Sequence, residues 1–554
     1  MDLTGLKQKF KGEITTSEAD LEHYSRDASI FQIAPTAIVF PHDVSDVQEL
    51  VKFVAGHKPA YPTLSLTPRG GGTDMTGGSI NDSIIIDVAK HLNKISDLSP
   101  SSVYTESGVM FRDLEVKLTA KNLMMPAYPV SKAWAAVGGM VGNNSGGEKT
   151  FKHGQVVDFV EELEVVLGDG NVYTIKPLTE AELNAKKALQ TYEGNFYREI
   201  FDLIQSNYKL LQEAKPTTSK NSSGYYLWDV WDGKTFDLTK LFVGSQGTLG
   251  IVTKIKWRLV PVKRFNKLVV FFLKDLSKLG EIVGHVNELQ PESFEIFDKH
   301  TLKLALKYLP EIVAKMKSNA SISNRVVSSF KLFWQFLPEL WMMLRGGLPQ
   351  VILLAEFVGD DEASVLKQAQ SAAENIHHHF NLPTHIAKSY EEAQKYWTIR
   401  RESYNLLRQH NARKISAPFI EDVIVHPDQL PNFMPRLDAI LAKYPDFVYT
   451  IAGHAGDANF HIIPLVDVHE IKHRTQILEM SGEVFKLVKE FKGSMAGEHN
   501  DGLVRGTFLP YMFGDKVYEI FKRTKQIFDP LNIFNPHKKS DANLDFYAEH
   551  VRHN

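Results

Sequence analysis

The chain has 554 residues, of which 43% are hydrophobic and 23% charged, and its formal net charge is −3. This length predicts two or three domains with an ample core, and the near-neutral charge gives no electrostatic basis for binding nucleic acid. Cysteine is absent, which excludes disulfides, cysteine nucleophiles, zinc–thiolate sites and iron–sulfur clusters ligated by this chain.

The first residues, Met1–Gly5, lack the basic and apolar regions of a signal peptide. No uninterrupted apolar run approaches the roughly 20 residues that span a bilayer. We therefore expect a cytoplasmic protein.

The first half of the chain predicts short strands and helices in alternation. Residues 1–35 are polar and predict a short helical cap. Apolar residues spaced at 47, 50, 51 and 54 predict a helix, with Ser45 as its N-cap. Thr179 is the expected N-cap of a second helical region. The expected strands are 37–41, 83–87, 161–167, 172–175 and 251–259, and the expected helices are 45–54, 111–120 and 180–209.

The second half continues with strands and helices of another unit that begins near residue 265. The pattern is that of an α+β domain. Its expected strands are 268–272, 351–357 and those within 449–463, and its expected helices are 276–289 and 362–380.

Residues 67–78 read Thr-Pro-Arg-Gly-Gly-Gly-Thr-Asp-Met-Thr-Gly-Gly, with five glycines in twelve positions. Glycine permits φ > 0 and close approach of another group, and successive N–H groups in such a turn form a nest for phosphate oxygens. The loop is neither a Walker motif nor a Gly-x-Gly-x-x-Gly fingerprint that opens a helix. It predicts a pyrophosphate site, with a plain surface turn as the alternative.

Two more loops of the same chemistry follow, at 138–147 and 244–250. Three glycine- and hydroxyl-rich loops predict a long ligand that is held at several points.

Together with Lys152-His153-Gly154, these loops resemble the FAD-binding domain of vanillyl-alcohol-oxidase-type (PCMH-type) flavoproteins. The resemblance extends over about 35–538 and is strongest to the D-lactate and D-2-hydroxyacid dehydrogenase branch, which includes glycolate oxidase flavin subunits. It implies an α+β fold, with a two-subdomain FAD-binding domain and an α+β substrate or cap domain. The implied FAD-binding residues are Pro68, Arg69, Gly70, Gly71, Gly72, Thr73, Thr76, Gly77, Gly138, Gly139, Asn143, Ser145, Gly146, Gly147, Gly154, Gly247, Thr248, Gly250, Ile251 and Asn535.

The resemblance also implies the domain boundaries and the way FAD is held. We expect the FAD-binding domain over 1–262, the cap domain with a metal site over 263–500, and a C-terminal segment, 501–554, that returns to the FAD-binding domain. Thr73 stands where relatives with histidyl-linked flavin carry the histidine, and cysteine is absent, so we expect non-covalent FAD.

His454-Ala-Gly-Asp-Ala-Asn-Phe-His461 lies between two apolar runs and predicts a hairpin with a two-residue type II′ turn at Gly456-Asp457. In that register His454 faces Asn459 and His461 faces Ala452, which places both imidazoles on one face within reach of one metal ion. Two surface histidines are the alternative.

By resemblance, Glu498 completes a His454/His461/Glu498 site for Zn²⁺, with Mn²⁺ or Fe²⁺ as alternatives. The resemblance also makes His499 the catalytic base and Arg400, in Trp397-Thr-Ile-Arg400, the residue that binds the substrate carboxylate; a solvated surface arginine is the alternative. The implied reaction is oxidation of a D-2-hydroxy acid to the 2-oxo acid, with proton transfer to a base and hydride transfer to flavin N5.

Some positions depart from the family pattern, among them Ile420, which stands at a position where the family has a lysine. Gln246 stands where relatives often have Glu. Ile463 replaces a polar Asn of dicarboxylate-oxidising relatives, which favours a small substrate such as D-lactate over D-2-hydroxyglutarate.

Several alternatives remain open. One is an oxidase for glycolate or an alditol that uses O₂, a second is a flavin subunit that needs an iron–sulfur partner, and a third is a non-redox flavin-dependent alkyl transferase. The electron acceptor expected for a dehydrogenase is a quinone, a cytochrome or an iron–sulfur partner subunit.

Residues 330–345 are apolar on nearly all sides, rich in Phe, Trp and Met, and flanked by basic residues. This composition suits a segment in the headgroup region of a membrane or a docking contact with a partner, and a buried helix is the alternative. The sequence therefore predicts a cytoplasmic enzyme that can attach peripherally to the inner face of the membrane.

Overall fold

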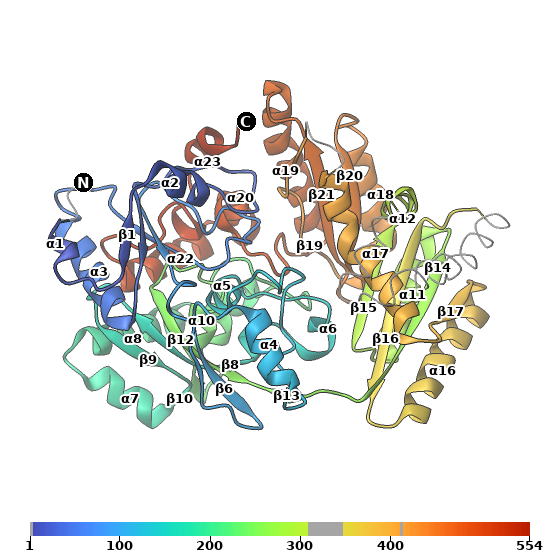
Figure 1. The fold of residues 1–554 in the computed structure, drawn as a ribbon, viewed down its shortest axis with the longest axis horizontal. Helices are drawn as coiled ribbons and strands as arrows, with labels where there is room; N and C mark the ends of the chain where they lie inside the picture. Colours follow the sequence, from blue (N-terminus) through green and yellow to red (C-terminus); the bar gives the residue numbers. More distant parts are fainter. Residues whose placement is uncertain (1–3, 309–346, 410–413, 554) are drawn as a thin grey trace, which may run out of the picture. The chain divides into compact units, whose positions relative to one another are not determined.

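The computed structural model describes residues 4–308, 347–409 and 414–553 (Figure 1). Residues 330–345, predicted as a docking segment, lie outside the described residues. The chain divides into two compact units, unit 1 with Met1–Val262 and Ser494–Asn554, and unit 2 with Lys263–Gly493. The second division falls after Gly493, where the sequence analysis placed it after residue 500, so Glu498 and His499 belong to unit 1.

Unit 1 contains two main sheets, as expected for a two-subdomain FAD-binding domain. The first has the order β1-β2-β4-β3, with parallel pairing of β4 to β2 and to β3, and the second is antiparallel with the order β5-β6-β12-β8-β9. These strands are β1 Glu13–Thr15, β2 Ala37–Phe40, β3 Leu66–Arg69, β4 Ile84–Asp87, β5 Ile95–Ser96, β6 Ser102–Glu106, β8 Val160–Val166, β9 Val172–Ile175 and β12 Ile251–Arg258. Two short pairs join β7 Leu123–Met124 with β13 Val260–Pro261, and β10 Leu178–Thr179 with β11 Thr235–Phe236.

The helices of unit 1 surround these sheets (Figure 1). They are α1 Thr4–Lys7, α2 Glu18–Tyr24, α3 Val44–His57, α4 Phe111–Thr119, α5 Val137–Asn143, α6 Thr150–His153, α7 Glu180–Ala188, α8 Tyr192–Ser206, α9 Tyr208–Ala214, α10 Thr239–Phe242, α20 Gly502–Gly506, α21 Leu509–Phe513, α22 Asp515–Phe528 and α23 Leu544–His550.

The N-terminal caps of two helices were predicted from the sequence, and one of the two predictions is confirmed. Thr179 caps α7 in a capping box with Glu182, as predicted. The predicted cap of α3 was wrong, because Asp43, not Ser45, accepts a hydrogen bond from the backbone N–H of Asp46. The predicted helical cap at the N-terminus is also incomplete, since β1 adds a strand to β2.

The C-terminal segment returns to the first sheet of unit 1. The backbone N–H of Leu66 donates to Ile533 O at 2.7 Å, and Asn535 N–H donates to Leu66 O at 2.8 Å. Ile533 and Phe534 are fully buried in the core formed by β2, β3, β4 and α3.

Unit 2 is an antiparallel sheet with the order β17-β14-β16-β15-β20-β21-β18, and β19 also pairs with β21. Its strands are β14 Phe265–Leu273, β15 Ser293–Asp298, β16 Val351–Gly359, β17 Thr384–Ile386, β18 Ile415–Ser416, β19 Val423–Ile424, β20 Val448–His454 and β21 Asn459–Val466. Its described helices are α11 Leu279–Glu288, α12 Lys299–Lys307, α16 Glu362–Phe380, α17 Tyr390–Gln409, α18 Leu430–Leu441 and α19 Ile471–Glu490.

One face of this sheet is covered by α12 and α17. Leu302 from α12 and Trp397 from α17 pack in one core with alternate residues of β14, β15 and β16, among them Phe297 (Figure 1). Because side chains alternate along a strand, Glu295 shares the face of Phe297. Among the described helices, none is both long and apolar enough to cross a bilayer.

Candidate flavin site and catalytic side chains

The first glycine loop follows directly after β3 and presents a row of backbone N–H groups. In the part of the chain that the structure describes, the N–H groups of Gly70, Gly71, Gly72 and Thr73 donate to no protein acceptor. Gly72 has φ of 66°, and a Cβ on Gly71 would lie 1.8 Å from Trp134 O. Only glycine fits these positions, and the result is a nest of donors suited to a pyrophosphate.

Arg69 lies beneath this loop. Its guanidinium donates to Arg26 O at 2.8 Å, lies 5.1 Å from the centre of the Tyr24 ring, and is in contact range of Gly72. The structure shows it as a support of the loop, and its predicted contact with FAD stays a prediction.

Asp74 organises the rest of the first loop. Its carboxylate accepts hydrogen bonds from Thr76 Oγ1 at 2.9 Å, from Asn143 Nδ2 at 3.1 Å and from Gly78 N. Burial raises the pKa of Asp74 to about 6, and the charge of Asp27 adds to that rise. Thr76 and Asn143, both predicted to bind FAD, are thereby brought together.

Gln246 of the third loop joins the same network. Its Nε2 donates to Thr76 Oγ1 and to Asn143 Oδ1, both at 3.2 Å, and its Oε1 accepts from Gly502 N at 2.8 Å. A carboxylate could not donate, so the departure to glutamine has a structural reason.

Asn535 fastens the C-terminal segment to the first and third loops. Its Nδ2 donates to Gly78 O at 2.8 Å and to Gln246 O at 2.7 Å, and Thr67 Oγ1 donates to its Oδ1 at 3.0 Å. The predicted residue thus joins segments far apart in the sequence.

Most of the other predicted FAD residues shape the same loops of unit 1. Gly138 and Gly139 lie in the first turn of α5, and a Cβ on Gly139 would meet nothing within 4 Å. Gly77 has φ of 80° and packs on Leu503. The remaining positions are fixed by near neighbours: Ser145 N donates to Met140 O, Gly146 lies against Glu498, Gly147 against Tyr128, Gly154 against Asp158, Gly247 against Pro68 and Gly250 against Leu167, while Thr248 donates to Ser245 O and Ile251 begins β12.

Glu498 is held inside unit 1 by a lysine. Lys220 Nζ lies 3.0 Å from Glu498 Oε2, and both side chains are at most 2% exposed. Ser222 N donates to Ala496 O at 2.9 Å, so the loop after Lys220 runs beside the glutamate segment. His499, at 22% exposure, has its Nε2 3.8 Å from Glu498 Oε1.

His454 and His461 lie together in unit 2. Ala452 pairs with His461 and His454 with Asn459, so the predicted register is confirmed. The predicted turn was wrong, because residues 455–457 form a 3₁₀ turn and the positive φ of 52° falls on Ala458. The two rings stand at 88° with centroids 5.2 Å apart, and their ligand atoms lie within 4.8 Å of one another.

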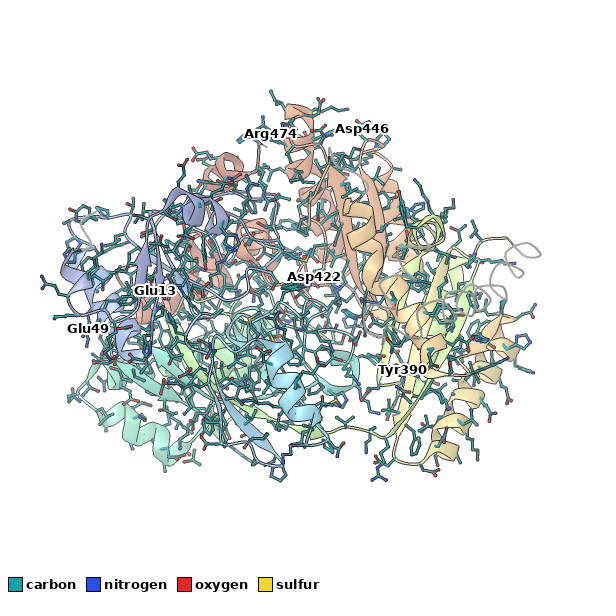
Figure 2. All side chains as sticks on the ribbon, viewed as in Figure 1. Glu13, Glu49, Tyr390, Asp422, Asp446 and Arg474 are labelled. Atoms are coloured by element: carbon teal, nitrogen blue, oxygen red, sulfur yellow. The ribbon has the colours of Figure 1, made fainter. Side chains whose placement is uncertain are left out.

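Each of these histidines has a buried carboxylate at Nδ1. Glu295 Oε1 lies 2.6 Å from His454 Nδ1, and Glu421 Oε2 lies 3.3 Å from His461 Nδ1. Asp422, which follows Glu421 and is labelled in Figure 2, is buried and accepts a hydrogen bond from Asn459 Nδ2 at 3.0 Å. A carboxylate at Nδ1 orients an imidazole so that Nε2 is the nitrogen that ligates a metal.

Arg400 lies on α17, with a side chain that is 4% exposed, so it is not a solvated surface arginine. Its Nη2 lies 2.5 Å from Glu295 Oε2. The arginine predicted to bind substrate and a histidine predicted to bind metal therefore share one carboxylate.

Comparison with known families identifies the chain. Residues 35–176 match the FAD binding domain, and residues 262–539, half of the chain, match the C-terminal domain of FAD linked oxidases. The chain belongs to the FAD-linked oxidases.

Curated relatives of this FAD-linked oxidase carry several names. It is 26% identical to D-2-hydroxyglutarate dehydrogenase of Pantoea ananatis over 96% of the chain and 50% of the relative, so it spans about half the length of that protein. It is 25% identical to glycolate oxidase subunit GlcD of Bacillus subtilis over 95% of the chain and 94% of the relative. It is also 25% identical to D-lactate dehydrogenase of Anaerostipes hadrus, over 91% of this chain and 89% of that relative.

Solved structures show the same fold. p-Cresol methylhydroxylase with substrate bound matches with a TM-score of 0.65 and 17% identity, over 96% of this chain and 94% of that one. Alkyldihydroxyacetonephosphate synthase matches with a TM-score of 0.65 and 14% identity, over 96% of this chain and 84% of that one. The expected vanillyl-alcohol-oxidase-type fold is confirmed.

Three residues of the FAD-binding unit were missed as site residues. Asp74 and Gln246 lie inside the glycine loops, and Asn500 Nδ2 donates to Gly244 O at 2.9 Å and to Asn143 O at 3.1 Å. A charged or amide side chain within a glycine-rich loop is the signal that could have identified the first two.

The position of Asp74 predicts that FAD binding by this FAD-linked oxidase depends on pH. Above its pKa of about 6 Asp74 is ionised, and it then repels the pyrophosphate; unit charges about 10 Å apart at an effective dielectric of about 20 repel by roughly 1.7 kcal/mol. We expect the Kd for FAD to rise about tenfold between pH 5 and 7.5, and to stay flat in Asp74→Asn. Fluorescence titration of apoprotein measures this, with Asp113→Asn on the exposed surface of α4 as control. An equal pH slope in Asp74→Asn would contradict the prediction.

Proposed function

We propose that this FAD-linked oxidase oxidises a D-2-hydroxy acid, with D-lactate as the preferred substrate, to the 2-oxo acid. The observation that carries the proposal is the pair His454 and His461 on neighbouring strands of unit 2. Each of these histidines has a buried carboxylate at its Nδ1. Such backing is typical of histidines that ligate metals, and the unpaired N–H groups of the first loop fit the FAD pyrophosphate.

We place a divalent ion, Zn²⁺ with Mn²⁺ or Fe²⁺ as alternatives, on His454, His461 and Glu498. Two histidines and one carboxylate would leave a coordination position for substrate, and an ion bound there would supply a Lewis acid that lowers the pKa of the substrate hydroxyl.

The side chains have separate tasks in the proposed reaction. Arg400 binds the substrate carboxylate, because a guanidinium carries five N–H donors and can hold a second carboxylate beside Glu295. His499 accepts the hydroxyl proton as the general base. FAD would be held without a covalent link, because Thr73 replaces the linking histidine and cysteine is absent, and when bound it would supply flavin N5 as the acceptor of the Cα hydride.

Ile463 supports the choice of a small substrate. It lies on β21 two residues after His461, so the two side chains share one face of the strand, and it is 9% exposed. An apolar group beside the histidine pair offers no partner to a second carboxylate.

A dye-linked assay tests the substrate. We expect D-lactate to have a higher kcat/KM than D-2-hydroxyglutarate or glycolate, and L-lactate to be inert. A preference for D-2-hydroxyglutarate would contradict the role of Ile463.

The electron acceptor has one specific alternative. One relative that this chain covers over 94% of its length is named as a subunit, which favours a partner protein over direct reduction of O₂. We propose a quinone, a cytochrome or an iron–sulfur partner subunit as acceptor, reached from a cytoplasmic or peripheral membrane location. Stoichiometric peroxide from air-saturated turnover would favour the O₂-using oxidase instead.

A further inference from the structure

Glu295 on β15 contacts two functional groups at once. It is cross-strand partner of His454, and its side chain is 1% exposed. Its Oε1 lies 2.6 Å from His454 Nδ1, and its Oε2 lies 2.5 Å from Arg400 Nη2. All three side chains lie within unit 2, and nothing in the sequence around residue 295 indicated this role.

The contact with His454 decides the state of the imidazole. A carboxylate only accepts hydrogen bonds, so His454 Nδ1 must carry the proton, and the lone pair is then on Nε2. A neutral imidazole in the other tautomer would place an N–H where a metal ion has to bind.

The contact with Arg400 gives the buried carboxyl group of Glu295 a cationic partner. A buried carboxylate without a cation takes up a proton or destabilises the fold. The guanidinium supplies the counter-charge, and the same carboxylate then fixes where the arginine can present its remaining edge to an anion.

The second histidine offers a comparison. Glu421 Oε2 is 3.3 Å from His461 Nδ1. Glu295 makes the shorter of the two contacts, and it also lies against the guanidinium of Arg400.

We propose that Glu295 is a positioning residue, which fixes His454 in the Nδ1–H tautomer for metal binding and sets the place of Arg400 relative to it. This inference rests on the proposed metal-binding function and adds a residue to it.

The proposal is tested by the affinity for Zn²⁺ of protein that contains FAD but from which metal has been removed. Competition with a chromogenic chelator measures this affinity. Glu295→Gln keeps the size but presents an amide donor toward either His454 or Arg400, so we expect the Kd for Zn²⁺ to rise 10- to 100-fold. Glu356→Gln, on the neighbouring strand β16, is the matched control and should leave the Kd unchanged. A Kd for Glu295→Gln within twofold of wild type would overturn the proposal.

A second measurement is made on wild-type protein and does not depend on the folding of Glu295→Gln. ¹⁵N NMR of metal-free wild-type protein with labelled histidine, assigned with His454→Gln, reports which nitrogen of His454 is protonated. A protonated Nδ1 supports the proposal, and an unprotonated Nδ1 overturns it. If wild-type protein binds no zinc, the proposed ligand set fails, while this measurement still decides the role of Glu295.

Discussion

The His461→Ala variant is expected to lose turnover with every 2-hydroxy acid while its flavin absorbance stays intact. His461 lies on β21 of unit 2, whereas the glycine loops that fit FAD lie in unit 1. In the proposed site, loss of one of the three ligands would remove the ion that is to acidify the substrate hydroxyl, so we expect only the chemistry to suffer. Steady-state dye reduction and the visible flavin spectrum measure the two effects separately.

Removal of the metal from wild-type protein should have the same result. Dialysis against a chelator is expected to abolish turnover, and added Zn²⁺ or Mn²⁺ should restore it in wild type but not in His461→Ala. His378→Ala, at the exposed end of α16, is the matched control with full activity. Full activity of a rigorously metal-free preparation would refute the metal site.

His499→Ala is expected to slow flavin reduction by about 10²- to 10⁴-fold, the range that a general base contributes. His499 follows Glu498 in a segment that hydrogen bonds from Ser222 hold beside the loop after Lys220, so loss of its imidazole should not disturb the neighbouring backbone. Substrate binding should change much less than the rate.

Anaerobic stopped-flow reduction by D-lactate separates these effects, because the dependence on concentration gives binding and the plateau gives the rate. His57→Ala, an exposed histidine of the FAD-binding unit at the end of α3, is the matched control. Reduction of His499→Ala at the wild-type rate would mean that another group accepts the proton.

Features fixed by local chemistry could be predicted from the sequence. The alternation of apolar residues set the register of the His454 hairpin, and Thr179 with Glu182 identified the start of α7. The glycine spacing of the three loops identified the FAD-binding unit. The N-cap of α3 was harder to predict, because Asp43 and Ser45 both offer a side-chain oxygen that could accept a hydrogen bond at the start of this helix.

Features that depend on distant strands could not be predicted. Glu295 meets His454 only because β15 pairs with β20, and it meets Arg400 only because α17 covers the same face of the sheet. Gln246 and Asn535 meet through segments that are almost 300 residues apart. No local pattern in the sequence encodes such pairings.

The most direct test of the central claim is anaerobic reduction of the bound flavin by single 2-hydroxy acids. We predict that D-lactate bleaches the flavin absorbance of metal-replete protein and yields one pyruvate per flavin, that L-lactate does not, and that metal-free protein stays yellow with both. Flavin that no D-2-hydroxy acid reduces in metal-replete protein would contradict the account.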